Sequence, residues 1–338
     1  MKAVNIQKEH TAALIEKEMP QIKTGEVLLR IKYAGFCGSD LNTFLGKNPM
    51  VALPVIPGHE IGAVIEAVGD GVPEHLQAGM NCTVNPYTHC GYCTSCRNRR
   101  PNACRYNQTL GVQRDGAMAE FITLPWRKVI ADDGISPKHF ALVEPMSVGF
   151  HAVSRAEATD IDTVMVIGCG MIGAGAIVRA ALRGAEVIAV DRDDDKLALA
   201  KRLGAKHTIN SQTEDLHQKL EELTQGNGPN VIIEAVGSPA TYRTAIDEVA
   251  FAGRVVCVGY AKTEVAFETK YFVMKELDIR GSRNALPEDF RAVIKYLKQG
   301  VCPVDELISG IYRPGQAQEA LSRWAENQGK VFRILIAF

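Results

Sequence analysis

TVMVIGCGMIG, residues 163–173, is the stretch of sequence that decides the fold of this chain. The run TVMVI is apolar almost throughout, as is typical of a parallel strand covered on both faces. The next six residues have the spacing G-x-G-x-x-G, and residues 171–183, rich in Ala and Ile, predict a helix. A glycine turn between a buried strand and a helix is the context in which this motif binds a dinucleotide.

Each glycine of this turn has its own physical task. Gly168 permits the tight turn, Gly170 lets the backbone approach a pyrophosphate, and Gly173 allows the helix to pack closely on the strand. The free N–H groups at the start of the helix then face the phosphates. Asp191 directly follows the next apolar run, EVIAV (186–190). At this position its carboxylate can accept hydrogen bonds from both ribose hydroxyls and repel a 2′-phosphate. NAD is therefore favoured over NADP.

The alternation of strands and helices continues to about residue 290. Further predicted strands are VIIEAV (231–236), RVVCVGY (254–260) and LDIRG (277–281), with a helix at about 239–251. Such alternation indicates an α/β fold with a doubly wound parallel sheet. Cofactor contacts are also expected at Met171, Ile172, Arg192, Val236, Val258, Gly259 and Ser282.

The pattern before residue 150 is different. Short β-prone runs, separated by Gly and Pro, lie at 26–33, 62–68 and 119–124. The length of 338 residues also favours two domains, because single cores stop growing at about 250–300 residues. We predict a mostly β domain over residues 1–150 and a cofactor domain over 151–289. The last segment, 290–338, ends in the apolar run VFRILIAF and is expected to rejoin the first domain.

Four cysteines in the first domain predict a structural zinc site. Cys90, Cys93, Cys96 and Cys104 have the spacing C-x2-C-x2-C-x7-C. Thiolates about 2.3 Å from one tetrahedral ion require a chain that folds back within a few residues, as this spacing allows. All four positions on such an ion would be filled, so the ion would be structural. The alternative is four reduced cysteines in a loop.

A second set of metal-ligand residue types lies in three short motifs. Cys37 and Ser39 belong to C-G-S-D, His59 and Glu60 belong to G-H-E, and Glu144 precedes Pro145. Thiolate, imidazole and carboxylate together are good ligands for zinc. Taken singly, each residue also has an ordinary structural interpretation, as a buried thiol, a hydrogen-bonded histidine or a capping glutamate.

In this order, the motifs resemble those of the zinc-dependent medium-chain alcohol and polyol dehydrogenases, and the resemblance covers essentially the whole chain. It implies a GroES-like β domain, completed by the C-terminal tail, together with a Rossmann domain. It also implies two zinc ions per chain: a structural one, and a catalytic one held by Cys37, His59 and Glu144, with Glu60 as a neighbouring or exchanging ligand. Glu144 stands where classical alcohol dehydrogenases have a second cysteine, which favours the sorbitol, threonine and sugar-acid branch.

The segment GSRNALPEDF (281–290) resembles that of bacterial L-galactonate and L-gulonate 5-dehydrogenases. These enzymes oxidise a secondary hydroxyl of a six-carbon aldonate. Arg283 and Asn284 are therefore expected to contact the substrate, because an arginine can form a bidentate pair with a carboxylate. Arg283 could equally contact the cofactor or a neighbouring subunit. The alternatives are a sorbitol-, xylitol- or galactitol-type polyol dehydrogenase, an L-threonine 3-dehydrogenase, and a non-catalytic regulator that binds NAD.

The expected mechanism follows from the chemistry of hydride removal. An alcohol must lose its proton before its carbon readily gives up a hydride. Zinc lowers the pKa of bound water from about 15.7 to about 7 and should act similarly on an alcohol. Ser39 would pass the released proton toward solvent. Asp40 would orient a zinc ligand.

Composition and the start of the sequence limit which partners and which cellular compartment we expect for this chain. The chain is 46% hydrophobic and 23% charged, with a formal net charge of −1, so no overall field attracts nucleic acid or an anionic membrane. Four arginines near the cysteines, Arg97, Arg99, Arg100 and Arg105, are interpreted as a solvated face; a zinc ribbon that binds nucleic acid is the alternative. The sequence starts MKAVNIQKEH without an apolar leader, which favours the cytoplasm. The resemblance implies a homodimer or homotetramer.

Overall fold

The computed structural model describes residues 1–338, which form two compact units. The first unit consists of Met1–Pro145 and Phe290–Phe338, and the second of Met146–Asp289. The helices α4 (Val143–Ala156) and α10 (Pro287–Leu297) each contain one of the two boundaries. The second unit is therefore an insertion into the sequence of the first.

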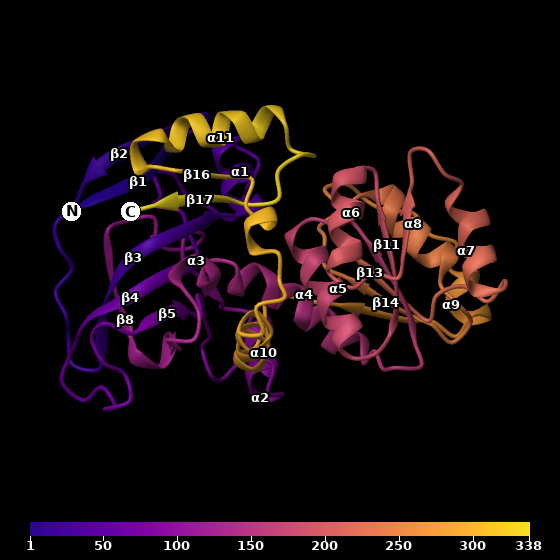
Figure 1. Ribbon diagram of the computed structural model, residues 1–338, viewed down its shortest axis with the longest axis horizontal. Coiled ribbons are helices and arrows are strands. Elements are labelled where there is room, and N and C mark those ends of the chain that lie inside the picture. Colours follow the sequence, from indigo (N-terminus) through magenta and orange to yellow (C-terminus); the bar gives the residue numbers. More distant parts are fainter. The chain divides into compact units, whose positions relative to one another are not determined.

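The first unit contains a sheet of seven strands in the order β16-β17-β3-β4-β5-β9, with β8 paired to β3 outside this path. The final apolar run of the sequence forms β17, which pairs antiparallel with β3 and is parallel to β16 (Figure 1). Two small sheets, β1-β2 and β6-β7, complete the unit. Its strands are β1 (Lys2–Lys8), β2 (Thr11–Glu16), β3 (Glu26–Phe36), β4 (Glu60–Val68), β5 (Asn81–Val84), β6 (Tyr87–Thr88), β7 (Gln108–Thr109), β8 (Phe121–Pro125), β9 (Val129–Ala131), β16 (Gly310–Tyr312) and β17 (Ile334–Ala337).

Short helices and two longer ones in the C-terminal segment accompany these sheets. They are α1 (Gly38–Phe44), α2 (Thr94–Arg97), α3 (Pro137–Phe140), α10, α11 (Ala317–Glu326) and the 3-10 helices η1 (Pro101–Ala103), η2 (Trp126–Lys128), η3 (Val304–Leu307) and η4 (Pro314–Gln316). Helix α11, yellow in Figure 1, lies along β2. Its buried side chains, including Leu321 and Trp324, join Phe36 and Ile334 in one core. Helix α11 thus ties the C-terminal segment to the N-terminal hairpin.

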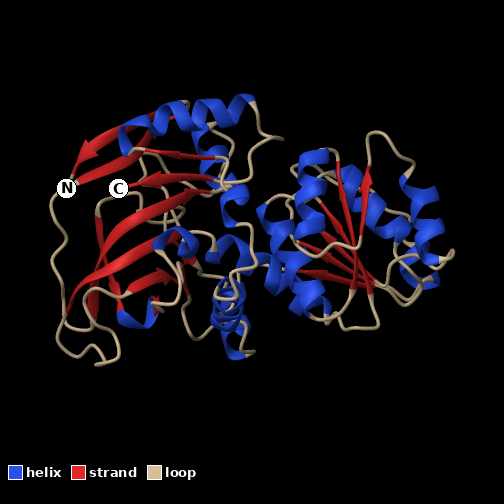
Figure 2. Cartoon of the chain, in the orientation of Figure 1, coloured by secondary structure: helices blue, strands red, loops and turns tan.

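The second unit contains a parallel sheet of six strands in the order β12-β11-β10-β13-β14-β15. The strands are β10 (Thr163–Ile167), β11 (Glu186–Asp191), β12 (His207–Asn210), β13 (Val231–Glu234), β14 (Arg254–Cys257) and β15 (Asp278–Gly281). Figure 2 shows helices on both faces of this sheet. This strand order is that of a dinucleotide-binding Rossmann fold, in which ligands bind where the order reverses, here between β10 and β13. The predicted fold class is confirmed.

The helices of the second unit begin at residues whose side chains or backbone suit a helix start. The Asp193 carboxylate accepts hydrogen bonds from the backbone N–H groups of Asp195 and Lys196, and Ser238 forms a capping box with Thr241 ahead of Pro239. The helices are α4, α5 (Met171–Leu182), α6 (Asp194–Arg202), α7 (Leu216–Thr224), α8 (Pro239–Glu248) and α9 (Lys270–Met274). No helix of the chain combines the length and the apolar character that crossing a membrane requires.

Candidate metal and cofactor sites

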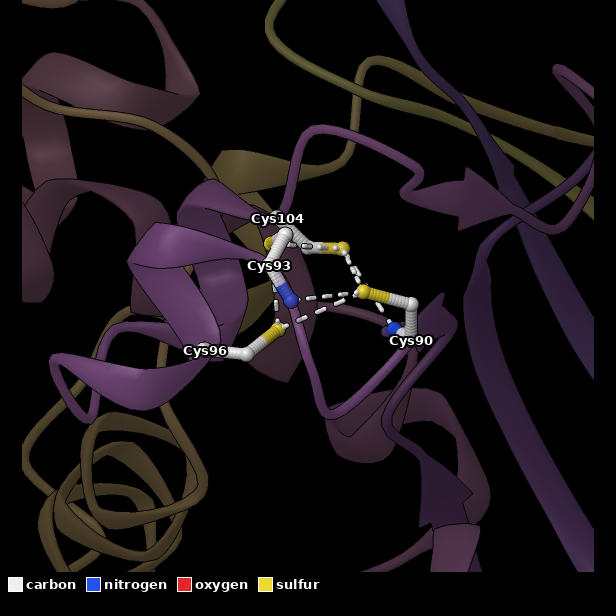
Figure 3. Close-up of side chains that lie close together, drawn as sticks. All are labelled: Cys90, Cys93, Cys96 and Cys104. Atoms are coloured by element: carbon white, nitrogen blue, oxygen red, sulfur yellow. Dashed lines mark hydrogen bonds between the residues drawn. The ribbon is translucent and has the colours of Figure 1, made fainter.

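In the first unit, the sulfur atoms of Cys90, Cys93, Cys96 and Cys104 face one another (Figure 3). Four of the six Sγ–Sγ distances run from 3.5 Å (Cys93 to Cys96) to 4.0 Å (Cys90 to Cys96). A tetrahedral zinc ion with four thiolates at about 2.3 Å places its sulfurs about 3.8 Å apart. A disulfide would need about 2.05 Å, and all nine cysteines are free thiols. The arrangement therefore fits a zinc ion.

Backbone N–H groups also point at these sulfurs. The N–H of Cys93 lies 3.3 Å from the Cys90 sulfur, and that of Tyr106 lies 3.3 Å from the Cys104 sulfur. The Ser95 hydroxyl, 3.1 Å away, together with backbone N–H groups lowers the pKa of Cys93 to about 5. Such donors stabilise thiolates, which are the form that binds a metal. Burial and hydrogen bonds with the neighbouring thiols raise the pKa of Cys96 to about 12, so these donors favour a thiolate at Cys93 and not at all four cysteines.

A second group of metal-binding side chains, the Cys–His–Glu cluster, consists of Cys37, His59 and Glu60. One ligand atom from each lies within 4.8 Å of the other two. Cys37 is the N-cap of α1, and Glu60 begins β4. Gly58, just before His59, has φ = +103°, and a Cβ there would lie 2.7 Å from Met118 Cγ. This glycine allows the chain to turn sharply and present His59 to Cys37.

Cys37 and His59 shift each other's pKa. Burial raises the pKa of Cys37, but the neighbouring His59 outweighs burial and the net pKa is lowered. Burial lowers the pKa of His59, but Cys37, Asp40 and Glu144 outweigh it and hold this pKa well above its usual value. Each of these two side chains therefore favours the charged form of the other. The buried Nδ1 of His59 has no hydrogen-bond partner in the protein, so a metal ion in place of the proton fits this donor set.

Glu60 is fully buried opposite Arg333. Arg333 Nε lies 3.1 Å from Glu60 Oε2, an ion pair whose geometry does not make a hydrogen bond, so both carboxylate oxygens lack a hydrogen-bond donor. Arg333 Nη1 donates to the Phe36 carbonyl oxygen at 2.7 Å. Burial raises the pKa of Glu60 well above its usual value, although Arg333 opposes this. Oε1, which has neither a hydrogen bond nor the contact with Arg333, is the oxygen most available to a metal ion.

Glu144, which was expected to be the third zinc ligand, lies next to this cluster without belonging to it. Its Oε1 accepts a hydrogen bond from the Tyr87 hydroxyl, and its charge helps to raise the pKa of both His59 and Glu60. The structure thus groups Cys37 with His59 and Glu60, and a role for Glu144 as a ligand stays a prediction.

Ser39 and Asp40 follow Cys37 on α1. The Asp40 carboxylate accepts a hydrogen bond of 2.8 Å from the backbone N–H of Cys37, which fixes the start of the helix and so the position of the thiol. The Ser39 hydroxyl oxygen is buried and has no hydrogen-bond partner in the protein. It is therefore available to a bound hydroxyl, and its role in proton transfer stays a prediction.

The glycine turn after β10 has the geometry that close packing needs. Gly168 has φ = +93°, a conformation that L side chains rarely adopt. A Cβ on Gly173 would lie 1.8 Å from the Gly168 carbonyl oxygen, whereas a Cβ on Gly170 would meet nothing within 4 Å. Gly173 is therefore required by the fold itself, and Gly170 leaves open space on the side where a ligand would bind.

Asp191 is fixed beside this turn by backbone hydrogen bonds. Its Oδ2 accepts from the N–H of Cys169 at 2.7 Å, and its Oδ1 accepts from Arg192 at 2.7 Å and Asp193 at 3.1 Å. The other expected cofactor contacts follow the carboxyl ends of strands in the same sheet: Met171 and Ile172 after β10, Arg192 after β11, Val236 after β13, Val258 and Gly259 after β14, and Ser282 after β15. Their contacts with a cofactor stay predictions. So do the substrate contacts of Arg283, an exposed residue, and Asn284, whose φ is +55°.

Tyr87 and Arg333, which contact Glu144 and Glu60 beside the Cys–His–Glu cluster, were not predicted from the sequence. Arg333 interrupts an otherwise apolar run, VFRILIAF, and a charged residue within a buried apolar segment is a signal that a partner exists. Tyr87 carries no comparable signal, because tyrosine is common in ordinary strands.

Comparison with known proteins shows two family matches. Residues 23–133 match the alcohol dehydrogenase GroES-like domain, and residues 172–299 match the zinc-binding dehydrogenase family. L-galactonate-5-dehydrogenase from Escherichia coli K12 is 31% identical over 324 residues, covering 96% of this chain and 95% of that protein.

Two solved structures are similar to this chain along its whole length. An alcohol dehydrogenase from E. coli CFT073, complexed with NADH, has a TM-score of 0.91 and 30% identity, covering 100% of this chain and 99% of that one. Galactitol-1-phosphate dehydrogenase from E. coli has a TM-score of 0.92 and 29% identity, with 100% of both chains covered. These relatives share a fold and differ in the substrate that their names state.

Proposed function

The chain belongs to the zinc-dependent medium-chain alcohol dehydrogenase family, and from this premise we propose that it oxidises a secondary hydroxyl of a six-carbon sugar acid of the L-gulonate or L-galactonate type. It is an NAD-dependent zinc dehydrogenase acting on CH–OH donors. In the proposed reaction R–CHOH–R′ and NAD+ give R–CO–R′, NADH and one proton. The observation that carries the proposal is the Cys–His–Glu cluster, whose His59 and Glu60 offer buried ligand atoms without hydrogen bonds.

When bound, zinc lowers the pKa of the substrate hydroxyl, and NAD accepts the hydride from the carbon. The residues of the chain position these groups. Cys37, His59 and Glu60, with Glu144 beside them, hold the metal, and the Ser39 hydroxyl takes the proton toward solvent. Asp191 holds the cofactor ribose, and the glycine turn accommodates the pyrophosphate.

Two observations support a sugar acid as the substrate. The relative named L-galactonate-5-dehydrogenase covers nearly the whole chain, and the segment 281–290 resembles such enzymes. The likeness to galactitol-1-phosphate dehydrogenase keeps a polyol or its phosphate as the second candidate, because the name of that relative states a phosphorylated polyol.

The test is the formation of NADH, followed at 340 nm, with zinc-loaded protein. The panel contains L-gulonate, L-galactonate, L-idonate, sorbitol, xylitol, galactitol and L-threonine. We expect turnover on one or more of the aldonates with a kcat/KM at least tenfold above that for any polyol. Comparable or better turnover on a polyol or on threonine would refute the sugar-acid assignment and leave the zinc mechanism in place. No turnover on any member, with NAD still bound, would favour either an alcohol outside the panel or the non-catalytic alternative.

We also infer that the chain works as a homodimer or homotetramer in the cytoplasm. Strand β15 is an edge of the parallel sheet and exposes Ile279, and the neighbouring α9 exposes Val273 (84%) and Met274 (61%). Unpaired edges and apolar side chains of this kind suit a subunit interface. Nine reduced thiols suit a reducing compartment. Light scattering of the wild type and an Ile279→Lys variant tests the interface; an unchanged mass would refute it.

A further inference from the structure

Two half-buried cations, Arg114 and Lys128, lie beside β6 in the first unit. The Lys128 ammonium donates to the Tyr87 carbonyl oxygen, and Arg114 Nη2 donates to the Thr88 hydroxyl oxygen at 3.0 Å. Neither cation has a carboxylate partner. Asp115, the acidic residue next to Arg114, is engaged elsewhere, with its Oδ2 at 2.8 Å from Lys17. We name Arg114 and Lys128 the cation pair.

Two like charges held together without an anion are electrostatically unfavourable. Burial lowers the pKa of Lys128, and the charge of Arg114 lowers it further. Burial also lowers the pKa of Arg114, and its Nε is buried without any hydrogen-bond partner. A buried donor that lacks an acceptor costs free energy, and so does the mutual repulsion. An anion bound at the cation pair would relieve both.

Tyr87 connects the cation pair to the Cys–His–Glu cluster. Its backbone carbonyl contacts Lys128, while its hydroxyl donates to Glu144. Burial and the charge of Glu144, followed by those of Cys37 and Glu60, raise the pKa of Tyr87, so its hydroxyl lies in the field of the cluster. A single residue, Tyr87, therefore reaches from Lys128 to the carboxylate beside the cluster.

We propose that Arg114 and Lys128 bind the anionic end of the substrate, a carboxylate or a phosphate, while the hydroxyl to be oxidised lies at the Cys–His–Glu cluster. The inference rests on the proposed function and names the residues that would select a sugar acid over a neutral polyol. The guanidinium of Arg114 offers a second, unpaired N–H beside the one bound to Thr88, and a planar guanidinium suits both kinds of anion.

The first experiment compares two substrates that differ only at one end. L-gulonate and sorbitol have the same hydroxyl configuration, but sorbitol has a CH2OH group in place of the carboxylate. In Arg114→Gln and Lys128→Gln, we expect kcat/KM for L-gulonate to fall about 10- to 100-fold and kcat/KM for sorbitol to stay within about twofold, as the loss of a charge-assisted contact predicts. Lys128→Arg should restore most of the activity on L-gulonate. Equal losses on both substrates would show that the cation pair only stabilises β6 and would overturn the proposal.

Arg127→Gln is the matched control. Arg127 is an exposed cation one residue from Lys128, and its guanidinium stacks 5.0 Å from the Trp126 ring. Its removal changes the net charge as Lys128→Gln does but leaves the cation pair intact. We expect it to leave kcat/KM unchanged for both substrates. A loss on L-gulonate equal to that of Lys128→Gln would reduce the effect to overall charge and would also overturn the proposal. The two Gln variants are independent, so one that fails to fold leaves the other to decide.

A binding measurement separates this inference from the proposed function. Isothermal titration of zinc-loaded protein with NADH, using L-gulonate and then galactitol 1-phosphate, reports anion binding without turnover. If the wild type oxidises no sugar acid, the proposed function fails, yet an at least tenfold weaker affinity for either anion in Lys128→Gln would still support the cation pair. A loss for L-gulonate identifies a carboxylate as the ligand, and a loss for galactitol 1-phosphate alone identifies a phosphate. Absence of binding in the wild type, or affinities unchanged in both Gln variants, would overturn the inference.

Discussion

Gly173→Ala tests whether the glycine turn is a packing requirement. A Cβ on residue 173 would lie 1.8 Å from the Gly168 carbonyl oxygen and 2.9 Å from its carbonyl carbon. Cβ atoms essentially never approach another heavy atom within 3.0 Å, so the start of α5 and the end of β10 must separate by at least 1.2 Å, the difference between 3.0 and 1.8 Å. Both atoms belong to backbone, so no side-chain rotation relieves the contact.

The expected cost is that of an overpacked core, about 1–3 kcal/mol, and the upper end applies because two secondary-structure elements must move. For a domain of this size, about 3 kcal/mol lowers the Tm by about 6–12 °C. The shift would be read from the thermal unfolding of the wild type and the variant at one zinc concentration and without NAD.

Gly170→Ala is the matched comparison within the same motif. A Cβ there would meet nothing within 4 Å, and Gly170 has φ = −70°, which alanine adopts without strain. We therefore expect an unchanged Tm and an NAD affinity at least tenfold weaker, because the methyl group would occupy the space left for the pyrophosphate. A Gly173→Ala protein with the wild-type Tm would refute the packing argument. A Gly170→Ala protein with the wild-type Kd for NAD would refute the cofactor argument.

Four further predictions concern other sites. Cys37→Ala should abolish turnover while NAD binding and one zinc per chain persist, measured by kinetics and metal analysis; near-normal turnover would reject its ligand role. Asp191→Ala should weaken NAD and relax discrimination against NADP, whereas an unchanged ratio of the two kcat/KM values would exclude its ribose contact. Cys104→Ser should lose one zinc and destabilise the first unit; retention of both ions after dialysis would contradict the four-thiolate site. Burial alone would raise the pKa of Asp115, but hydrogen bonds and the charge of Lys17 lower it below the unfolded value of 3.8. The Asp115 carboxylate therefore stabilises the fold above pH 3.8, and this stabilisation is lost as the pH falls through the lower pKa of the folded state. The Tm difference between wild type and Asp115→Asn should therefore shrink in acid, and a difference that grows would reverse this sign.

The parallel sheet could be predicted from sequence where the signals are local. The predicted strand TVMVI is β10 residue for residue, because an apolar run and a glycine turn set its limits. The predicted strand 231–236 ends instead at Glu234, whose buried carboxylate accepts hydrogen bonds from the N–H groups of Val236 at 3.0 Å and Gly237 at 2.8 Å. These contacts turn the chain out of the ladder, and apolar pattern alone does not reveal them.

The surroundings of the candidate metal cluster depend on contacts between distant residues. Glu60 meets Arg333 because β4 and β17 belong to one sheet, whereas Tyr87, in the separate β6-β7 sheet, meets Glu144 on helix α4. Likewise β12 (His207–Asn210) was not predicted, because its four residues include two polar side chains and a histidine, and its strand character comes from pairing with β11. The sequence motifs therefore predicted the metal-binding residues, whereas the residues that surround them depend on tertiary contacts.

The insertion of one unit into the sequence of the other also orders events during synthesis. All of Met146–Asp289 leaves the ribosome before β17, so the dinucleotide-binding unit, which is continuous in sequence, can fold first. The first unit must wait, with residues 33–36 of β3 lacking their partner strand, until β17 arrives. Arg333, just before β17, comes with it, so Glu60 gains its counter-charge in the last step of the assembly. A nascent chain should therefore acquire its nucleotide-binding half before its metal-binding half.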